Sequence, residues 1–376
     1  DDAPWPAAPP RVRRLPAPDP MRGLYVTRAA ASGPAMWSLL ALARRTGLNT
    51  LVFDVKDARG RVLYPSTVGL AHLVGADADG AMPVARVHAL MDSLRAHRIF
   101  AIARIVVGVD PLLAAQRPEW AVRQRDGQPW HDSTGAPWID PSHRAVWAYA
   151  ADLASEAVAR GFDAVEFDDA RFPDAPGMAR EARFALPAGR DRAQVVRDGL
   201  AFLDYRTAPL GAPVAFAVPG EAAADSSGGP GGLRWDALAA RADLVMPREF
   251  PSAFPAGAFG LADPASQPYE LVSRALAEAK RRDAAVRGAG ALVPWYQDFS
   301  MGAAAYDSAR VRDQIRAGYA AGIRGWLLWN PASEYTEAAL REPAPRRDST
   351  GARPGARAKS GAKSAAKGRG RAAGRR

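Results

Sequence analysis

The sequence predicts an α/β fold of the (β/α)8 TIM-barrel type, with a long insertion after the third strand and disordered termini. Short aliphatic and β-branched runs alternate with longer segments of helical periodicity, which is the pattern of parallel strands joined by helices. Eight strands can be counted within about 320 residues, a size typical of this barrel with insertions. The alternative, a doubly wound open sheet, usually has a glycine-rich first turn, whereas here the first strand is followed only by Ser32-Gly33-Pro34.

The eight predicted strands are short and rich in aliphatic residues, and most of them end in polar residues. In chain order they are residues 23–27, 50–56, 99–106, 164–168, 213–218, 244–250, 291–297 and 325–329. Seven helices are predicted, at residues 36–45, 84–97, 144–160, 193–205, 235–240, 269–282 and 308–321. Gly47, Gly161 and Gly322 follow three of these helices, where a left-handed residue commonly ends a helix.

The barrel domain is predicted at residues 21–342, between two segments of different composition. Residues 1–20 contain seven prolines and are expected to form an extended, solvated linker. Residues 343–376 are expected to be a basic disordered tail, because they have almost no apolar side chains to bury. The chain starts at Asp1 without a methionine, so we expect a removed leader and a secreted, periplasmic or envelope-attached protein, with a cytoplasmic location as the alternative.

The formal net charge of +10 belongs to the tail. Residues 346–376 hold 11 Lys and Arg against one Asp, while residues 1–345 hold 39 basic and 39 acidic residues. The body is therefore neutral, and its composition does not predict a groove for nucleic acid. The tail is expected to bind anionic polymers by counterion release, with an affinity that falls as salt rises.

Several kinds of chemistry are excluded by what the sequence lacks. It has no cysteine, which removes thiol catalysis and cysteine-ligated metals. No apolar run reaches the 18 or so residues of a membrane span. The five histidines show no paired metal spacing, and neither a nucleotide-binding motif nor a Ser-His-Asp arrangement is present. We therefore expect no metal, nucleotide or other cofactor, and carboxylate chemistry remains.

Polar residues gather at the carboxyl ends of the predicted strands, where the active site of such a barrel forms. Alternation along the fourth strand places Glu166 and Asp168 on the face opposite Val165 and Phe167, so the carboxylates point into the barrel if the apolar pair meets the helices. The candidate substrate-binding residues are Asp54, Lys56, Arg104, Trp138, Glu166, Arg171, Trp295, Gln297, Trp329 and Asn330. A network of buried ion pairs is the competing interpretation of the charged members.

The insertion after the third strand, residues 108–140, is rich in tryptophan. It contains Trp120, Trp130 and Trp138, and the last two strands contribute Trp295 and Trp329. Such rings could stack on the apolar faces of sugars, while loop packing is the alternative for those in the insertion.

The strand ends resemble those of a bacterial family described as putative glycoside hydrolases, a TIM-barrel domain of undetermined substrate. The resemblance covers about residues 21–340 and is carried by segments 22–27, 52–57, 103–106, 138–141, 167–173, 245–247, 294–299 and 326–331. This chain departs from the family pattern at Glu166 and Asp169, where Gln and Tyr are usual. It also lacks the histidine that the family tends to have after the sixth strand.

The resemblance implies a glycoside hydrolase that acts on a polysaccharide, with the cell envelope as the expected source. Glycosidic cleavage needs one protonated and one ionised carboxyl group. We expect Asp168 to be the ionised partner because Lys56, Arg104 and Arg171 favour its charged form. Candidates for the acid are, in order, Asp298, Glu249 and Glu221. The alternatives are a saccharide-binding barrel without catalysis and a polyanion binder that works through the tail.

Overall fold

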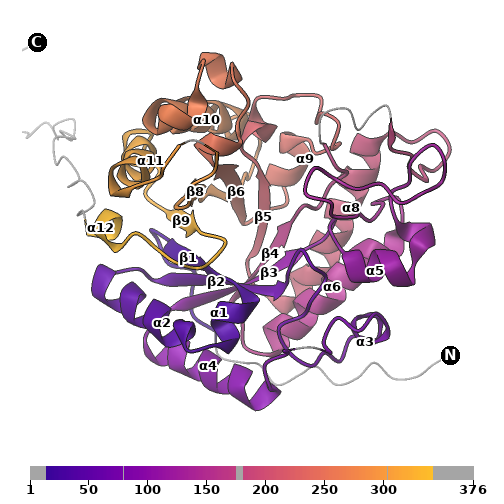
Figure 1. The fold of residues 1–376 in the computed structure, drawn as a ribbon, viewed down its shortest axis with the longest axis horizontal. Helices are drawn as coiled ribbons and strands as arrows, with labels where there is room; N and C mark the ends of the chain where they lie inside the picture. The colour runs from indigo at the N-terminus through magenta and orange to yellow at the C-terminus, as the bar shows by residue number, and fades with distance from the viewer. Residues whose placement is uncertain (1–13, 79, 175–180, 303, 342–376) are drawn as a thin grey trace, which may run out of the picture. The chain divides into compact units, whose positions relative to one another are not determined.

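A computed structural model describes residues 14–78, 80–174, 181–302 and 304–341, and these residues form the predicted barrel (Figure 1). All strands pair in parallel, in the order β5-β4-β3-β2-β1-β9-β8-β6-β7, and the β5–β6 pairing closes the ring. The strands are β1 (Arg22–Val26), β2 (Thr50–Lys56), β3 (Phe100–Val106), β4 (Ala164–Asp168), β5 (Val214–Pro219), β6 (Leu244–Glu249), β7 (Ala291–Leu292), β8 (Trp295–Gln297) and β9 (Trp326–Trp329).

The predicted seventh strand is split into β7 and β8. Both pieces pair with β6, and only β8 pairs with β9, so together they occupy one position of an eight-stranded barrel. Pro294 lies in the gap and cannot donate a ladder hydrogen bond, although its carbonyl oxygen accepts one from the Leu327 N–H at 2.9 Å. The prediction of one continuous strand over residues 291–297 is therefore wrong at this proline.

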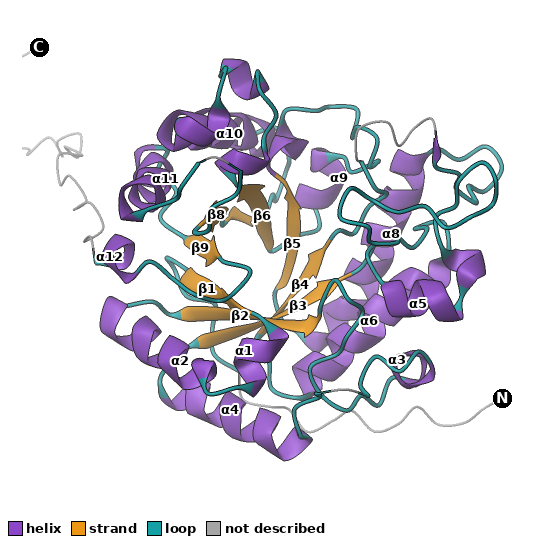
Figure 2. Cartoon of the chain, viewed as in Figure 1, coloured by secondary structure: helices purple, strands orange, loops and turns teal. Residues whose placement is uncertain are grey.

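Helices surround the ring of strands, as Figure 2 shows. Each of the seven predicted helices is present, and short ones are added. They are α1 (Arg28–Ser32), α2 (Ala35–Thr46), α3 (Gly69–Leu73), α4 (Val84–Ala96), α5 (Pro111–Gln116), α6 (Arg144–Ala159), α8 (Arg192–Thr207), α9 (Trp235–Ala239), α10 (Pro268–Asp283), α11 (Ser308–Ala320) and α12 (Glu337–Leu340), with 3-10 turns η1 (Pro118–Trp120), η2 (Ala208–Leu210), η3 (Gly220–Ala223), η4 (Pro251–Ala253), η5 (Ala258–Gly260) and η6 (Pro264–Ser266). Within the described ranges, no helix is both long and apolar enough to cross a bilayer.

Alternation along the strands divides the apolar side chains into two layers. One layer fills the space between strands and helices and includes Val165 and Phe167. The other fills the barrel interior and is called the lumen cluster here; its buried members are Met21, Tyr25, Val52, Phe100, Ile102, Ala164, Ala215, Leu244, Met246, Val293, Trp295 and Leu327. Because Ala164 belongs to the lumen cluster, Glu166 and Asp168 point into the barrel, which confirms the predicted orientation.

Residues 14–20 dock on the barrel, in contrast to the solvated linker that was predicted. Leu15 packs against the lumen cluster, and its N–H donates a 2.9 Å hydrogen bond to Asp163. Arg14 donates to the Leu210 carbonyl oxygen at 2.5 Å. The prolines prevent regular structure here, but one apolar side chain among them is enough to anchor the segment. The rest of the predicted linker and the basic tail lie outside the described residues.

Gly199 fixes the contact between α8 and α6. A β-carbon at this position would lie 2.2 Å from Cε2 of Trp147, whose ring is buried and whose Nε1 donates to the Pro141 carbonyl oxygen at 2.7 Å. Gly199→Ala is therefore expected to lower the free energy of unfolding by about 1–3 kcal/mol through overpacking. Chemical denaturation measures this. Exposed Gly69 at the start of α3, with open space around it and no positive φ, is the matched position for comparison, and equal effects of Ala at both sites would contradict the packing argument.

Candidate active site

Charged residues occupy the lumen just above the lumen cluster, at the carboxyl ends of β2, β3 and β4. Strand register sets Asp54 beside Arg104 and Arg104 beside Glu166. All three side chains, together with Asp168, are buried. The predicted polar cluster is thus present in the barrel mouth, where a barrel of this type carries its site.

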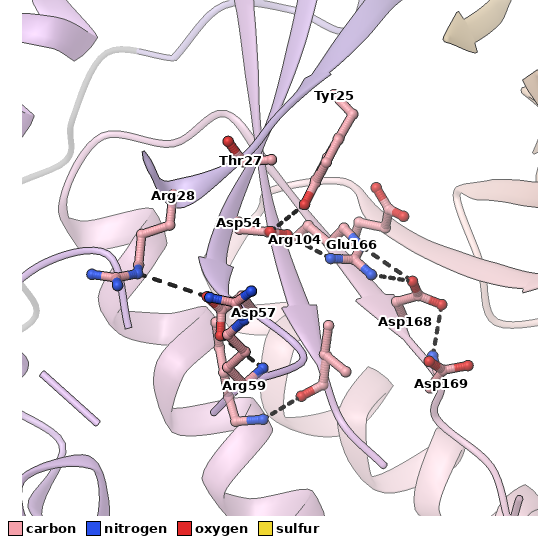
Figure 3. Close-up of polar contacts among 12 residues, drawn as sticks. Tyr25, Thr27, Arg28, Asp54, Asp57, Arg59, Arg104, Glu166, Asp168 and Asp169 are labelled. Carbon is pink, nitrogen blue, oxygen red and sulfur yellow. Dashed lines mark hydrogen bonds and ion pairs between the residues drawn. The ribbon is translucent and has the colours of Figure 1, made fainter. Parts of the chain in front are cut away.

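Arg104 joins two carboxylates (Figure 3). Its Nη1 donates to Asp54 Oδ1 at 2.5 Å, while its Nη2 and Nε donate to Asp168 Oδ2 at 2.6 and 3.1 Å. Tyr25 donates its hydroxyl hydrogen to Asp54 Oδ2. The guanidinium also lies over the ring of Trp329, 4.7 Å from its centroid, and Trp329 stacks on Tyr25. These contacts fix Arg104 in one orientation between Asp54 and Asp168.

The ion pairs continue from Asp168 across the mouth of the barrel. Arg248 donates to both oxygens of Asp168, at 3.0 and 3.3 Å, and to Asp169 at 3.1 Å. Arg171 donates to the same oxygen of Asp169 at 3.1 Å. We call the row Arg104, Asp168, Arg248, Asp169 and Arg171 the lumen ion network. It buries charges that are mutually paired, which is the condition under which charges are tolerated in an interior.

Two members of this network, Arg248 and Asp169, were not among the predicted site residues. Arg248 shares its face of β6 with Leu244 and Met246, so strict alternation would have placed it in the lumen. Asp169 has a positive φ of 49°, a conformation that Asp adopts more readily than most residues. This backbone turn directs its carboxylate toward Arg248 and Arg171, and no sequence pattern reports such a turn.

Burial and neighbouring charge set the protonation of the carboxyl groups. Burial raises the pKa of Asp54, and the opposing effect of Arg104 does not cancel this rise. Burial also raises the pKa of Glu166 to about 8; its Oε1 accepts from Trp295 at 3.2 Å, and its Oε2 has no partner within the described chain. Burial would raise the pKa of Asp169 too, but Arg248 and Arg171 lower it to about 2. The lumen therefore holds both proton-retaining and firmly ionised carboxyl groups.

A first cavity of about 420 Å³ opens above Asp54. Its floor contains Asp54, Arg104 and the rings of Tyr25 and Trp329. Asp57, Arg59 and Arg28 line its rim, in the loops after β2 and β1 (Figure 3). This cavity combines aromatic faces with donors and acceptors, which is the composition that a sugar-binding site requires.

A second cavity of about 410 Å³ lies at the ends of β4, β5 and β6. Arg171, Glu221 and Phe254 line it, together with the glycine-rich turn after η3. Arg104 lines the first cavity and Arg171 the second, so the lumen ion network runs from one cavity to the other.

Lys56 does not join the predicted cluster. A register shift between Asp54 and Lys56 breaks the alternation on β2. The Lys56 ammonium group instead pairs with buried Asp110 at 3.0 Å and donates to the Val106 carbonyl oxygen at 2.7 Å. The prediction that Lys56 lies beside the Asp168 carboxylate was therefore wrong. Lys56 instead ties β2 to the loop after β3.

Polar residues at the ends of β8 and β9 also make structural hydrogen bonds. The two Asp298 oxygens accept hydrogen bonds from the Thr336 hydroxyl and N–H at 2.7 and 2.8 Å, and burial raises the pKa of this carboxyl. Asn330 donates to the Asp298 carbonyl oxygen at 2.5 Å, and Gln297 donates to Ser252 and to the Phe299 carbonyl oxygen. These three residues hold loops together, and none of them lines either cavity.

The other two candidates for the acid lie apart from Asp168. Glu249 faces the layer between strands and helices, is fully buried, and neither of its carboxyl oxygens has a described partner. Burial raises the pKa of Glu249 well above its usual range, and the charge of Glu221 adds to this rise. Glu221 itself is exposed and lines the second cavity.

The tryptophans differ in their access to a ligand. Trp329 lines the first cavity, whereas Trp295 is fully buried in the lumen beneath Glu166. Trp138 is buried in the insertion, where Asp132 accepts its N–H and Arg171 covers its ring at 5.3 Å. Trp138 and Trp295 therefore support polar site residues from below, and only Trp329 offers a face to the cavity. Across the described ranges, no group of three or more His, Asp or Glu side chains is arranged to hold a metal ion.

A barrel with paired carboxyl groups in its mouth is the architecture of glycoside hydrolases. Residues 23–335 match the family model described as "Putative glycosyl hydrolase domain". The match spans most of the chain, and the protein belongs to this family. It thus carries a glycosyl hydrolase-like domain, as the resemblance implied. No curated protein matches the chain.

Solved structures of glycoside hydrolases share the fold. The PgaB (BpsB) glycoside hydrolase domain from Bordetella bronchiseptica is 13% identical, with a TM-score of 0.57, over 85% of this chain and 97% of that one. The α-L-fucosidase isoenzyme 2 from Paenibacillus thiaminolyticus is 12% identical, with a TM-score of 0.54, over 86% and 48%. The α-galactosidase TtGalA from Thermus thermophilus is 18% identical, with a TM-score of 0.51, over 88% and 63%. At these identities the likeness concerns the barrel alone.

Proposed function

We propose that the protein hydrolyses glycosidic bonds of a polysaccharide at the mouth of the barrel, with Asp168 as the ionised carboxylate and Asp54 as the acid. The observation that carries this proposal is the Arg104 bridge between Asp54, which lines the first cavity with Arg104, and Asp168, which is buried beside them. Hydrolysis requires one carboxyl group that keeps its proton and one that does not.

The surroundings of the two carboxyl groups support these roles. Asp168 accepts hydrogen bonds from Arg104 and Arg248, which stabilise its charged form. Asp54 lines the cavity, and burial raises its pKa above the ordinary value, which favours its protonated form relative to an exposed aspartate. We therefore prefer Asp54 as the acid over the predicted candidates Asp298, Glu249 and Glu221, because none of those three belongs to the Arg104 bridge.

The test is incubation with a panel of envelope and storage polysaccharides, with new reducing ends as the readout. For a polysaccharide that the wild type cleaves, Asp168→Asn and Asp54→Asn should each lower the rate at least about a hundred-fold, as expected for the loss of an acid–base group. Asp92→Asn, at an exposed position of α4, is the control and should retain the rate. Wild-type rates in both site variants would contradict the proposal.

A second candidate is a saccharide-binding barrel without catalysis. It is favoured by one observation: both Asp168 oxygens are occupied by arginine donors, and the side chain is 1% exposed. In that case the panel would give binding without new reducing ends, and Asp168→Asn would change affinity only. The same assay therefore separates the two functions.

We also propose an envelope polysaccharide as the natural substrate. The first cavity has the composition of a sugar-binding site, and the chain also carries a strongly basic tail. The tail would attract anionic envelope polymers and raise the encounter rate. Deletion of residues 346–376 should weaken retention on isolated envelope and on heparin, most strongly at low salt. Unchanged retention after deletion would eliminate the tail as the binding element.

A further inference from the structure

The first and second cavities lie at opposite ends of the lumen ion network. Hydrogen bonds connect Arg104 through Asp168, Arg248 and Asp169 to Arg171 without a gap. Arg104 lines the first cavity and Arg171 lines the second. The two cavities thus flank one row of charged groups, which is the arrangement expected when a chain-like ligand crosses the row.

Arg171 has a donor that the described protein leaves unused. The residue is 6% exposed, and its Nη1 and Nη2 are engaged with Phe172, Asp174 and Asp169. Its Nε has no acceptor among the described residues. A buried donor without a partner carries a free-energy cost, so the protein leaves this end of the lumen ion network incompletely satisfied beside the second cavity.

The remaining lining of the second cavity suits a sugar ring. Phe254 and Leu233 offer apolar surface, while Glu221 and Asp225 offer acceptors for hydroxyl or ammonium hydrogens. Its charged groups are three carboxylates, those of Asp174, Glu221 and Asp225, against the single guanidinium of Arg171. A sugar that carried its own carboxylate would be repelled by this excess of negative charge.

We propose that the second cavity is a separate sugar subsite, which holds a further unit of the polysaccharide and admits only sugars without an acidic group. This inference rests on the proposed function for the identity of the chain that crosses the network. It adds that the polysaccharide lies across the barrel mouth with units on both sides of Asp168.

Binding of single sugars tests the subsite without any need for turnover. Saturation-transfer NMR is recorded with methyl glucoside, methyl glucosaminide and methyl glucuronide on the wild type, Phe254→Ala, Glu221→Lys and the exposed control Glu270→Lys. We expect the wild type to bind the glucoside and glucosaminide, with affinities lowered at least about fivefold by Phe254→Ala. Glu221→Lys should raise the glucuronide affinity at least about tenfold relative to the glucoside, while Glu270→Lys should change neither.

Each other outcome contradicts the subsite. Binding that none of the variants at Phe254 and Glu221 alters would place the sugar elsewhere, and equal wild-type binding of glucuronide would refute the charge selection. Absence of binding by all three glycosides would refute the subsite itself. Glu221 is exposed, so its variant stays informative if Phe254→Ala, at a buried position, fails to fold. If the wild type binds the single sugars but cleaves none of the panel polysaccharides, the proposed function is refuted and the subsite still stands.

Discussion

Arg104→Met should lower the free energy of unfolding by about 3–5 kcal/mol, the range typical when one partner of a buried ion pair is removed. The substitution keeps an unbranched side chain of similar length but leaves Asp54 without its guanidinium and Asp168 with only the Arg248 side chain and the Asp169 N–H among its described donors. Both carboxyl groups are buried, so loss of these hydrogen bonds carries a large free-energy cost. Denaturant unfolding, followed by tryptophan fluorescence, measures the loss.

Two comparisons isolate the cause. Arg86→Met removes an exposed arginine of α4 and should change stability by no more than about 0.5 kcal/mol. Adding Asp54→Asn to Arg104→Met should recover part of the loss, because it removes the buried carboxyl group that was left without its guanidinium partner. If the double variant is as unstable as the sum of the two single variants, the two side chains do not interact, and the bridge has no energetic role.

Glu249→Gln should stabilise the protein, and the gain should grow with pH. The folded-state pKa of Glu249 is raised, chiefly by burial, so the folded protein holds this proton at pH values where the unfolded chain has released it. The contribution to stability is complete below the unfolded pKa of about 4.5 and is lost as pH rises toward the folded pKa. A neutral glutamine has no such dependence, so the gain should increase by about 1.4 kcal/mol for each pH unit above this value.

Unfolding free energies of wild type and Glu249→Gln between pH 4.5 and 7 test this, and their difference should grow as pH rises from 4.5 toward the folded-state pKa. Tyr296, whose hydroxyl group also lacks a described partner, is the register partner of Glu249 in the β6–β8 pairing. Because Glu249 is outside the barrel mouth, sugar binding should be unchanged. A pH-independent difference would show that Glu249 is ionised in the folded state.

The fold followed from the sequence because strand alternation and helix periodicity are local signals. The bounds of β2 and β4 are as predicted, and the seventh strand fails only where Pro294 interrupts it. The orientation of Glu166 and Asp168 was equally predictable, since the apolar side chains of Val165 and Phe167 occupy the opposite face of the same strand. These successes concern residues whose environment is set by their own strand.

Part of the site was less predictable because the contact of Arg248 with Asp168 joins strands that are not adjacent. Arg248 on β6 reaches Asp168 on β4 past Ala217 and Pro219 of β5, the register partners of Met246 and Arg248. Small side chains on an intervening strand give no positive signal in the sequence. The prediction for Lys56 failed for a different reason. A bulge of one residue redirected this side chain, which alternation alone would place in the lumen.

The pairing of the first strand with the last has a consequence for biosynthesis. β1 hydrogen-bonds to β9, about 300 residues later in the chain, and the following segment adds a hydrogen bond from the Tyr335 hydroxyl to the Tyr25 carbonyl oxygen and an ion pair between Glu337 and Arg45. Until β9 leaves the ribosome, one edge of β1 has no partner and the lumen cluster cannot be enclosed. Closure of the barrel must then wait for nearly the whole domain to be translated, and nascent chains that stop short expose an edge strand open to aggregation.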